Sequence, residues 1–304
     1  MRQSMRIACI GTGTVGASWV ALFITGTHEV TAWDPAPGWQ DRLLAALDRY
    51  EPQLRELNIP TVRTRLRLCA SLSEAVAEAE LIQENAPEQI DLKRALVREI
   101  ACLAPLDSII ASSTSGLLPA DIARGIPNPG RLLVAHPFSP PHLIPAMEIV
   151  GTPEMPTERL EAAVEFYRSI GKQPVLMSRA IAGFIGNRLQ AAMWREGFHM
   201  IAAGEATMEE IDNIIKGGPG LRWGINGPCE GQLDWIDPEA SGEIDEERWS
   251  ILMQTDWSRL AGPPLTDALR DILRPQLLAA RAKKLTGDAW EDRLVAVRRA
   301  VGNI

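Results

Sequence analysis

His136 and Glu148 are the two residues in this sequence best suited to acid–base chemistry. An apolar run leads His136 into a proline-rich turn, and Glu148 follows on a second apolar run. The unperturbed pKa of imidazole lies near neutrality, and a carboxylate on its far nitrogen would fix the tautomer and stabilise the imidazolium. The alternative is a core histidine satisfied by any acceptor, because such pairs also occur for structural reasons. Taken alone, the stretch 131–151 favours a core histidine. The other motifs of the chain decide between this interpretation and an acid–base pair.

A strand, a glycine turn and a helix are expected in succession near the start of the sequence. Arg6 to Ile10 is an apolar run typical of a strand, and Ala17 to Thr25 is typical of a helix. Between them lies G-x-G-x-x-G, and a helix N-terminus there would present free backbone N–H groups to a pyrophosphate. The expected cofactor contacts in this loop are Gly11, Gly13, Thr14, Val15 and Gly16.

The next strand favours NAD over NADP as the cofactor. His28 to Trp33 is the expected strand, and Asp34 follows it, where a carboxylate accepts hydrogen bonds from the ribose hydroxyls. Residues 35–37 are Pro-Ala-Pro and offer no arginine or lysine to a 2′-phosphate. The alternative is a glycine turn followed by a chance aspartate.

Strand-like and helical stretches alternate through the first part of the chain, which predicts a Rossmann-type, doubly wound parallel sheet. Ligands bind at the carboxyl ends of the strands in such sheets. Ala86 and Glu88 lie at one of these ends and are expected to contact the cofactor. The other expected strands are 65–69, 81–86, 108–111 and 174–177, and the expected helices are 39–57, 71–79, 91–103, 117–124 and 157–169.

A cluster of small hydroxyl residues, 112–116, follows the strand 108–111 and has two interpretations. Hydroxyl residues at a strand end commonly cap the next helix, here 117–124. In a doubly wound sheet the cluster would also lie where the cofactor meets the substrate, and Ser113 would then contact the cofactor. The cluster alone favours capping.

The sequence changes character near Ala180. Its 304 residues suggest about two domains. Beyond Ala180 the strand signals nearly vanish, a long helical segment opens at Ile181, and glycine-rich breaks follow at 217–220 and 224–228. We therefore predict an NAD-binding Rossmann domain over 1–180 and an all-helical domain over 181–304, to which the family resemblance described below assigns substrate binding and dimerisation.

The composition argues against nucleic acid or a membrane as a partner. Hydrophobic residues make up 46% of the chain and charged residues 23%, and the formal net charge is −8. A negative charge gives no reason to bind nucleic acid or an anionic membrane surface, and no stretch approaches the roughly 18 apolar residues of a membrane span.

Scattered cysteines suit a reducing compartment. With no apolar signal region ahead of the glycine loop, we expect a cytoplasmic location.

The order of motifs resembles the 3-hydroxyacyl-CoA dehydrogenase superfamily, and within it the branch that acts on free 3-hydroxy acids. The resemblance covers Ile7 to about Trp235 and rests on IGTGTVGASW, TAWDPAPG, LIQENAPE, IIASSTSGLLP, VAHPFSPPHLIPAMEIVG, AGFIGNRL and GPGLRW. Beyond this range no part of the chain matches securely. The family implies an NAD-dependent dehydrogenase.

The resemblance implies roles for four residues: the catalytic histidine falls on His136, its orienting glutamate on Glu148, the substrate-positioning serine on Ser115 and a helix-borne asparagine on Asn187. His136 would take the hydroxyl proton while hydride leaves C3 for NAD, and Ser115 and Asn187 would fix the reacting oxygen. This chemistry needs no metal. Ser139 departs from the family, which commonly has asparagine there, and this puts a contact near the nicotinamide or substrate in doubt.

Arg222 and Trp223 bear on the choice of substrate. The free-acid branch has this arginine, whereas acyl-CoA enzymes tend to lack it, and guanidinium binds a carboxylate in a bidentate way. Trp223 would face a trimethylammonium group. A solvated arginine and a packed tryptophan are the structural alternatives. We expect a substrate with a free carboxylate, L-carnitine first, with L-gulonate, a 3-hydroxyacyl-CoA or a non-catalytic crystallin-like role as alternatives, and a homodimer through the C-terminal domain.

Overall fold

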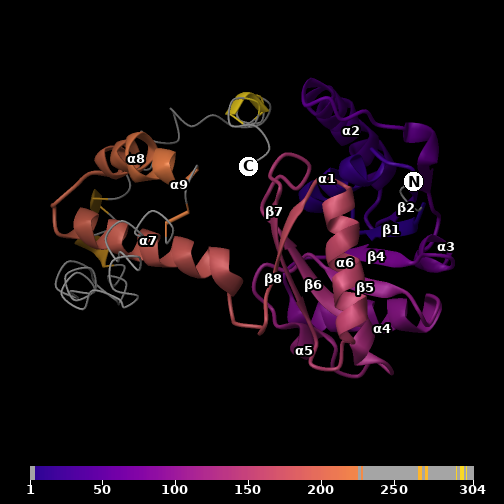
Figure 1. The fold of residues 1–304 in the computed structure, drawn as a ribbon. Coiled ribbons are helices and arrows are strands. Elements are labelled where there is room, and N and C mark those ends of the chain that lie inside the picture. The colour runs from indigo at the N-terminus through magenta and orange to yellow at the C-terminus, as the bar shows by residue number, and fades with distance from the viewer. Residues whose placement is uncertain are drawn as a thin grey trace, which may run out of the picture. The chain divides into compact units, whose positions relative to one another are not determined.

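The computed structural model describes residues 4–224, 227–228, 266–268, 271–272, 292, 295–297 and 299. Contacts divide the chain into two compact units, Met1–Asn187 with Asp288–Arg299, and Arg188–Gly287 with Ala300–Ile304. Figure 1 labels the elements of both units. Cys229 and Trp235 lie outside the described residues.

The first unit contains one eight-stranded sheet in the order β3-β2-β1-β4-β5-β6-β7-β8. The strands are β1 (Arg6–Ile10), β2 (Glu29–Trp33), β3 (Leu66–Leu68), β4 (Leu81–Glu84), β5 (Ile109–Ser112), β6 (Leu132–Pro137), β7 (Ala146–Gly151) and β8 (Gln173–Leu176). The strands from β1 to β6 pair in parallel, β7 pairs antiparallel with β6, and β8 pairs parallel with β7. The predicted Rossmann-type sheet is confirmed, with two strands reversed at one edge.

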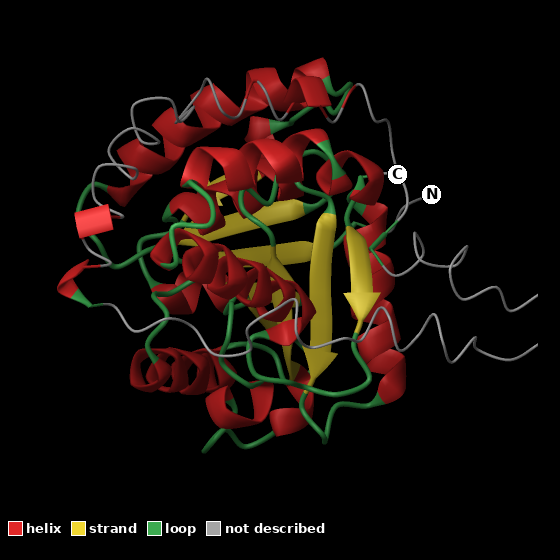
Figure 2. Cartoon of the chain, turned by 90° about the vertical axis from the view of Figure 1, so that its left-hand side faces the viewer, coloured by secondary structure: helices red, strands yellow, loops and turns green. Residues whose placement is uncertain are grey.

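Helices cover both faces of this sheet (Figure 2). They are α1 (Thr14–Phe23), α2 (Trp39–Glu56), α3 (Leu72–Val76), α4 (Ile90–Leu103), α5 (Pro119–Ile122) and α6 (Thr157–Ser169), with short 3-10 turns at Arg63–Arg65 and Pro129–Arg131. Alternate side chains of a strand point to opposite faces. In β1, Ile7 and Cys9 therefore join the core under α1, α2 and α6, whereas Ala8 and Ile10 join the core under α3, α4 and α5.

The reversed strands β7 and β8 add a detail that the prediction of a parallel sheet did not contain. Parallel neighbours need a crossover of about a dozen residues or more, usually containing a helix. The connection from β6 to β7 is the short segment 138–145, which contains no helix. A short proline-rich turn can only return the chain antiparallel, and this return sets the residues of β6 directly opposite those of β7.

The second unit is helical where it is described. Its helices are most of α7 (Phe184–Ala202), which begins in the first unit, α8 (Met208–Gly217) and α9 (Pro219–Trp223). Thr207 and Glu210 form a capping box at the start of α8. The expected break at 217–220 is wrong in its second half, because Pro219 starts α9 at a position where its fixed φ favours a helix. Within the described residues, no helix combines the length and apolar composition needed to cross a membrane.

Candidate active site

His136 and Glu148 face each other across the antiparallel strands β6 and β7. They are direct partners in the register of the two strands, which explains why one short turn suffices to bring them together. His136 Nδ1 lies 2.7 Å from Glu148 Oε2, and each residue is only 4% exposed. With Nδ1 engaged, Nε2 is the nitrogen that can exchange a proton with a substrate.

The second carboxylate oxygen of Glu148 holds the start of α7. Its Oε1 accepts hydrogen bonds from the backbone N–H groups of Ile185 at 2.7 Å and Gly186 at 3.0 Å. These N–H groups belong to the first turn of a helix, which has no intrahelical acceptor for them. Burial alone would raise the pKa of Glu148, but the hydrogen bonds from His136, Gly186 and Ile185 outweigh it and lower the pKa. Glu148 is therefore a carboxylate at neutral pH.

Two phenylalanines flank the imidazole. The ring centroids of Phe138 and Phe184 lie 5.3 Å and 5.4 Å from that of His136. Phe184 is fully buried and has a φ of 49°, a left-handed conformation that costs a non-glycine residue on the order of 1–3 kcal/mol. A Cβ on Gly186 would lie 2.3 Å from the Phe138 ring. The glycine thus allows the ring to lie close to α7, and both rings restrict the imidazole.

Ser115 and Asn187 lie together, as the resemblance led us to expect of two substrate contacts. Asn187 Nδ2 donates to the carbonyl oxygen of Ser115 at 2.7 Å. Glu88 holds the same turn, because its Oε1 accepts from the Thr114 hydroxyl at 2.5 Å and from the N–H groups of Ser115 at 3.1 Å and Gly116 at 3.0 Å. A carboxylate of the expected cofactor loop therefore shapes the turn of the expected substrate serine.

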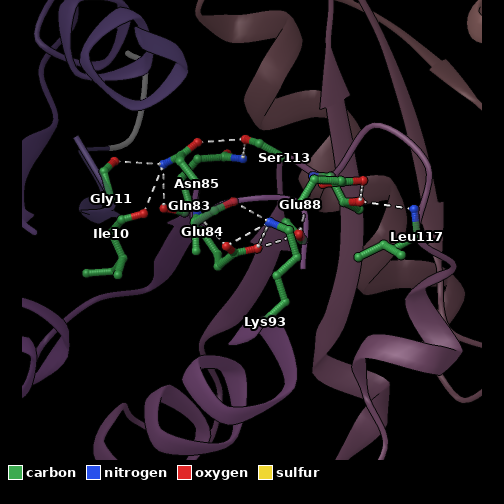
Figure 3. Close-up of polar contacts among 12 residues, drawn as sticks. Ile10, Gly11, Gln83, Glu84, Asn85, Glu88, Lys93, Ser113 and Leu117 are labelled. Carbon is green, nitrogen blue, oxygen red and sulfur yellow. Dashed lines mark hydrogen bonds and ion pairs between the residues drawn. The ribbon is translucent and has the colours of Figure 1, made fainter. Parts of the chain in front are cut away.

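The hydroxyl cluster does not cap α5. Leu118 occupies the N-cap position, and the helix has no side-chain cap. Thr114 Oγ1 instead accepts the N–H of Leu117 at 3.0 Å, ahead of the helix (Figure 3), and the Ser112 hydroxyl donates to Glu84 Oε2 at 2.5 Å. The capping interpretation is wrong because the hydroxyl residues end before Leu118, the N-cap position of α5. The hydroxyls of Ser112 and Ser113 instead donate to Glu84 and Asn85 at the end of β4.

The glycine loop has the geometry that a pyrophosphate requires. Gly11 has a φ of +84°, and a Cβ on Gly16 would lie 1.9 Å from the Gly11 carbonyl oxygen. Gly13 precedes α1, contributes no side-chain cap, and has open space within 4 Å of where its Cβ would be. Thr14 and Val15 open the helix, so their N–H groups have no acceptor within it and can bind an anion. These residues fit NAD.

Asp34 joins the glycine loop to the end of β2. Its Oδ2 accepts the N–H of Thr12 at 2.7 Å and the Thr12 hydroxyl at 3.3 Å, and its Oδ1 accepts the N–H of Ala36 at 2.8 Å. Sequence reasoning missed Thr12. It also missed Arg42, whose Nη1 donates to the carbonyl of Pro37 at 2.7 Å and so places a guanidinium beside the Pro-Ala-Pro turn.

A buried ion pair anchors the loop that carries Ala86 and Glu88 (Figure 3). Lys93 Nζ lies 2.9 Å from Glu84 Oε1 and 3.0 Å from Oε2, and it also donates to the Ala86 carbonyl at 2.9 Å. The N–H of Ala86 donates to Glu84 Oε1 at 2.6 Å. Both charges are almost fully buried and fully hydrogen-bonded, as burial of charge requires. Ala86 is thereby fixed through both of its backbone polar groups.

Arg222 and Trp223 lie on α9, in the second unit, and both side chains are exposed there. Trp194, on α7 of the same unit, is also exposed. The first unit holds the remaining predicted site residues. Among the residues that the structure describes, no cluster of three or more His, Cys, Asp and Glu side chains could hold a metal ion.

A doubly wound sheet with a glycine loop, and a buried imidazole–carboxylate pair on the same sheet, define a Rossmann-type dehydrogenase. Residues 6–180 match the NAD binding domain of 3-hydroxyacyl-CoA dehydrogenase, and residues 183–231 match its C-terminal domain. The chain belongs to the 3-hydroxyacyl-CoA dehydrogenase family and is an NAD-dependent dehydrogenase. The resemblance found in the sequence and the prediction of NAD as the cofactor are confirmed.

Several relatives and solved structures are similar over most of the chain. An L-carnitine dehydrogenase of Nocardiopsis dassonvillei is 40% identical over 98% of this chain and 92% of the relative, and one of Pseudomonas aeruginosa is 38% identical over 87% and 83%. The structure of 5-formyl-3-hydroxy-2-methylpyridine 4-carboxylic acid 5-dehydrogenase, an NAD+-dependent dismutase, has a TM-score of 0.83 at 27% identity, covering 98% of this chain and 99% of that one. An Escherichia coli 3-hydroxybutyryl-CoA dehydrogenase has a TM-score of 0.66 at 27% identity, covering 72% and 47%.

Proposed function

We propose that this protein oxidises the 3-hydroxyl of a small free L-3-hydroxy acid to the 3-oxo acid, with L-carnitine as the leading substrate. The observation that carries the proposal is the 40% identity to an L-carnitine dehydrogenase over nearly the full length of both chains. The buried His136–Glu148 pair supports catalysis over a crystallin-like structural role, because Glu148 engages Nδ1 and leaves Nε2 to exchange a proton with a substrate.

In the proposed mechanism His136 is the general base. Its Nε2 takes the proton of the substrate hydroxyl, and the Glu148 carboxylate stabilises the imidazolium through Nδ1. Bound NAD supplies the acceptor for the hydride that leaves C3. Ser115 and Asn187, which are tied together by a hydrogen bond, would hold the reacting oxygen so that proton and hydride leave from one fixed geometry.

Arg222 and Trp223 are the proposed contacts to the rest of the substrate. The guanidinium would bind the carboxylate in a bidentate way. The indole would face the trimethylammonium group of carnitine through a cation–π contact worth roughly 0.5–2 kcal/mol. L-gulonate has the carboxylate but no cation, and a 3-hydroxyacyl-CoA has a thioester in place of the carboxylate and no trimethylammonium group. Comparing these substrates therefore tests the roles of Arg222 and Trp223.

The test is a substrate panel with NAD at alkaline pH: L-carnitine, L-gulonate, 3-hydroxybutyrate and 3-hydroxybutyryl-CoA. L-carnitine should give the highest kcat/KM. Arg222→Ala should raise KM for the free acids by about tenfold or more, because it removes a hydrogen-bonded charge partner, whereas Arg195→Ala, an exposed arginine of the same unit, should change nothing. Acyl-CoA turnover that survives Arg222→Ala would establish the acyl-CoA alternative instead.

A second variant separates catalysis from binding. His136→Ala should lower kcat by about 10²-fold or more, the usual loss for a missing general base, and should leave NADH binding intact. If the wild-type protein binds NADH but oxidises none of the panel, the enzymatic proposal fails and the crystallin-like alternative takes its place.

We also propose a functional division of the chain, an oligomeric state and a cellular location. The functional division is an NAD-binding domain over 1–180 and a substrate and dimerisation domain over 181–304, so that substrate contacts such as Arg222 come from the second domain. The protein is a homodimer through that domain, supported by exposed apolar side chains such as Leu189 and Ile214. It works in the cytoplasm, where its cysteines stay reduced; Cys9, Cys69 and Cys102 are free thiols in the structure.

A further inference from the structure

The side chains of Asn85 and Ser113 form a polar junction between the glycine loop and the hydroxyl cluster (Figure 3). The Ser113 hydroxyl accepts hydrogen bonds from Gln83 Nε2 at 2.8 Å and from Trp19 Nε1 at 3.0 Å, and it donates to Asn85 Oδ1 at 2.7 Å. A hydroxyl has one donor and two acceptor positions. All three are used inside the protein, so the Ser113 side chain has none left for a ligand.

The direction of these hydrogen bonds is fixed by the carbonyl oxygens around Asn85. Its Nδ2 lies within hydrogen-bond distance of three backbone carbonyls, and only an NH₂ group can donate to them. Asn85 Oδ1 therefore faces Ser113 and accepts from its hydroxyl. The Ser113 oxygen is left to accept from Gln83 and Trp19, and Gln83 Oε1 accepts from the Tyr167 hydroxyl at 2.5 Å.

The NH₂ group of Asn85 faces the glycine loop. It contacts the carbonyl oxygens of Ile10 at 3.2 Å, Gly11 at 3.4 Å and Gln83 at 3.0 Å. The same Gly11 carbonyl lies against Gly16, where a Cβ would approach it to 1.9 Å. The amide therefore holds the first peptide of the glycine loop, and Gly16 in the first turn of α1 packs closely against the same peptide.

We propose that Asn85, oriented by Ser113, is the positioning residue that sets the Gly11 peptide and thereby the pyrophosphate-binding turn, and that Ser113 acts on the cofactor through Asn85 and not as a side-chain ligand. This inference rests on NAD being the cofactor. It also connects two parts of the site, because Ser113 precedes the Ser115 turn in the same hydroxyl cluster. Asn85 is thus a coupling point between the cofactor loop and the substrate turn.

Ser113→Ala and its matched control, Ser108→Ala, test the proposal. Ser108 and Ser113 flank β5 at its two ends, and both hydroxyls bond inside the protein. The Ser108 hydroxyl lies 2.7 Å from the carbonyl oxygens of Ala79 and Pro105. Ser113→Ala should raise the Kd for NADH, measured by fluorescence titration, about fivefold or more, the effect of about one hydrogen bond. Ser108→Ala should lower Tm and leave that Kd unchanged.

Two further measurements separate positioning from general damage. Adenosine lacks the pyrophosphate, so Ser113→Ala should bind it as the wild type does, and Ser113→Thr, which keeps the hydroxyl, should restore NADH affinity. Asn85→Ala serves if Ser113→Ala does not fold. An NADH Kd within twofold of the wild type, equal weakening in Ser108→Ala, or equal loss of adenosine binding would each overturn the proposal. A wild-type protein that does not bind NADH would instead overturn the proposed function.

Discussion

Glu148→Gln tests whether this carboxylate sets the tautomer of His136. A glutamine can keep its oxygen on the N–H groups of Ile185 and Gly186, which now bond Oε1 of Glu148. Its NH₂ group then faces Nδ1 of His136, which must accept, so the ring proton moves to Nε2 and that nitrogen can no longer take a proton. We expect kcat to fall by about 10²-fold or more, with little change in the Kd for NADH. A variant with near-normal kcat would remove Glu148 from the mechanism.

The same substitution has a pH signature in stability. The pKa of Glu148 is lowered in the folded protein, so its ionised form adds stability above the unfolded pKa of about 4.3, and this is lost as pH falls through the folded pKa. The Tm of Glu148→Gln should therefore fall below that of the wild type at pH 7, and the gap should narrow below about pH 4. Glu165→Gln, which removes an exposed pair with Arg168, should show almost no gap at either pH.

At the scale of elements, the start of α7 packs tightly at Gly186 against Phe138, the residue that follows β6. A Cβ there would lie 2.3 Å from the Phe138 ring, and that ring packs beside His136. Gly186→Ala should displace the ring, cost about 1–3 kcal/mol as overpacking does, and lower kcat more than it raises the KM for NAD. Thermal unfolding measures the loss of stability, and stopped-flow turnover measures kcat and the KM for NAD.

The matched control lies on the same helix. A Cβ on Gly197 would meet its nearest neighbour, Ile211, at 3.7 Å, which is ordinary contact, so Gly197→Ala should stabilise the helix by up to about 1 kcal/mol. The double variant Gly186→Ala with Phe138→Leu removes the clash and should recover stability but not full activity, because it removes the aromatic ring that packs beside His136. Recovery of neither would show that the clash does not cause the defect.

The sequence indicated which residues come together better than the way they are joined. His136 and Glu148 could be located because a short proline-rich turn links their two apolar runs, and the glycine loop because a strand, a glycine turn and a helix follow one another. The junction of Asn85 and Ser113 could not, because a polar residue after a strand looks the same whether it bonds a ligand or a neighbouring peptide. Gln83, fully buried in β4, was the one available signal, since a buried amide must find partners.

The fold could be predicted wherever periodicity alone sets the element. Alternating strands and helices gave β1 to β6 with their helices, because each βαβ step repeats one local pattern. The reversal at β7 depends on the length of the turn 138–145, and α9 depends on Pro219 at a helix start, which a glycine-rich context concealed. The left-handed Phe184 had no signal at all, because tertiary packing around His136 imposes it.

At the scale of the whole molecule, one helix belongs to both units. The first unit ends at Asn187, and α7 continues into the second. Glu148 binds the first turn of this helix, and Asn187, one residue beyond that turn's Gly186, bonds the Ser115 carbonyl. The start of α7 is therefore hydrogen-bonded both to Glu148, the partner of His136, and to the Ser115 turn, all within the first unit.

The proposed homodimer gives the prediction for the whole molecule. The chain has a mass of 33.3 kDa, and sedimentation should give twice that value. On α7, Leu189 is 58% and Trp194 59% exposed, and apolar side chains of this size on one helix are typical of a surface that a partner covers. Leu189→Lys or Trp194→Lys should shift the protein toward the monomer, because a lone charge is costly in an apolar interface. Leu106→Lys, at a 78% exposed leucine of the first unit, should leave the dimer intact. A wild-type monomer, or a dimer that withstands both α7 substitutions, would contradict dimerisation through this helix.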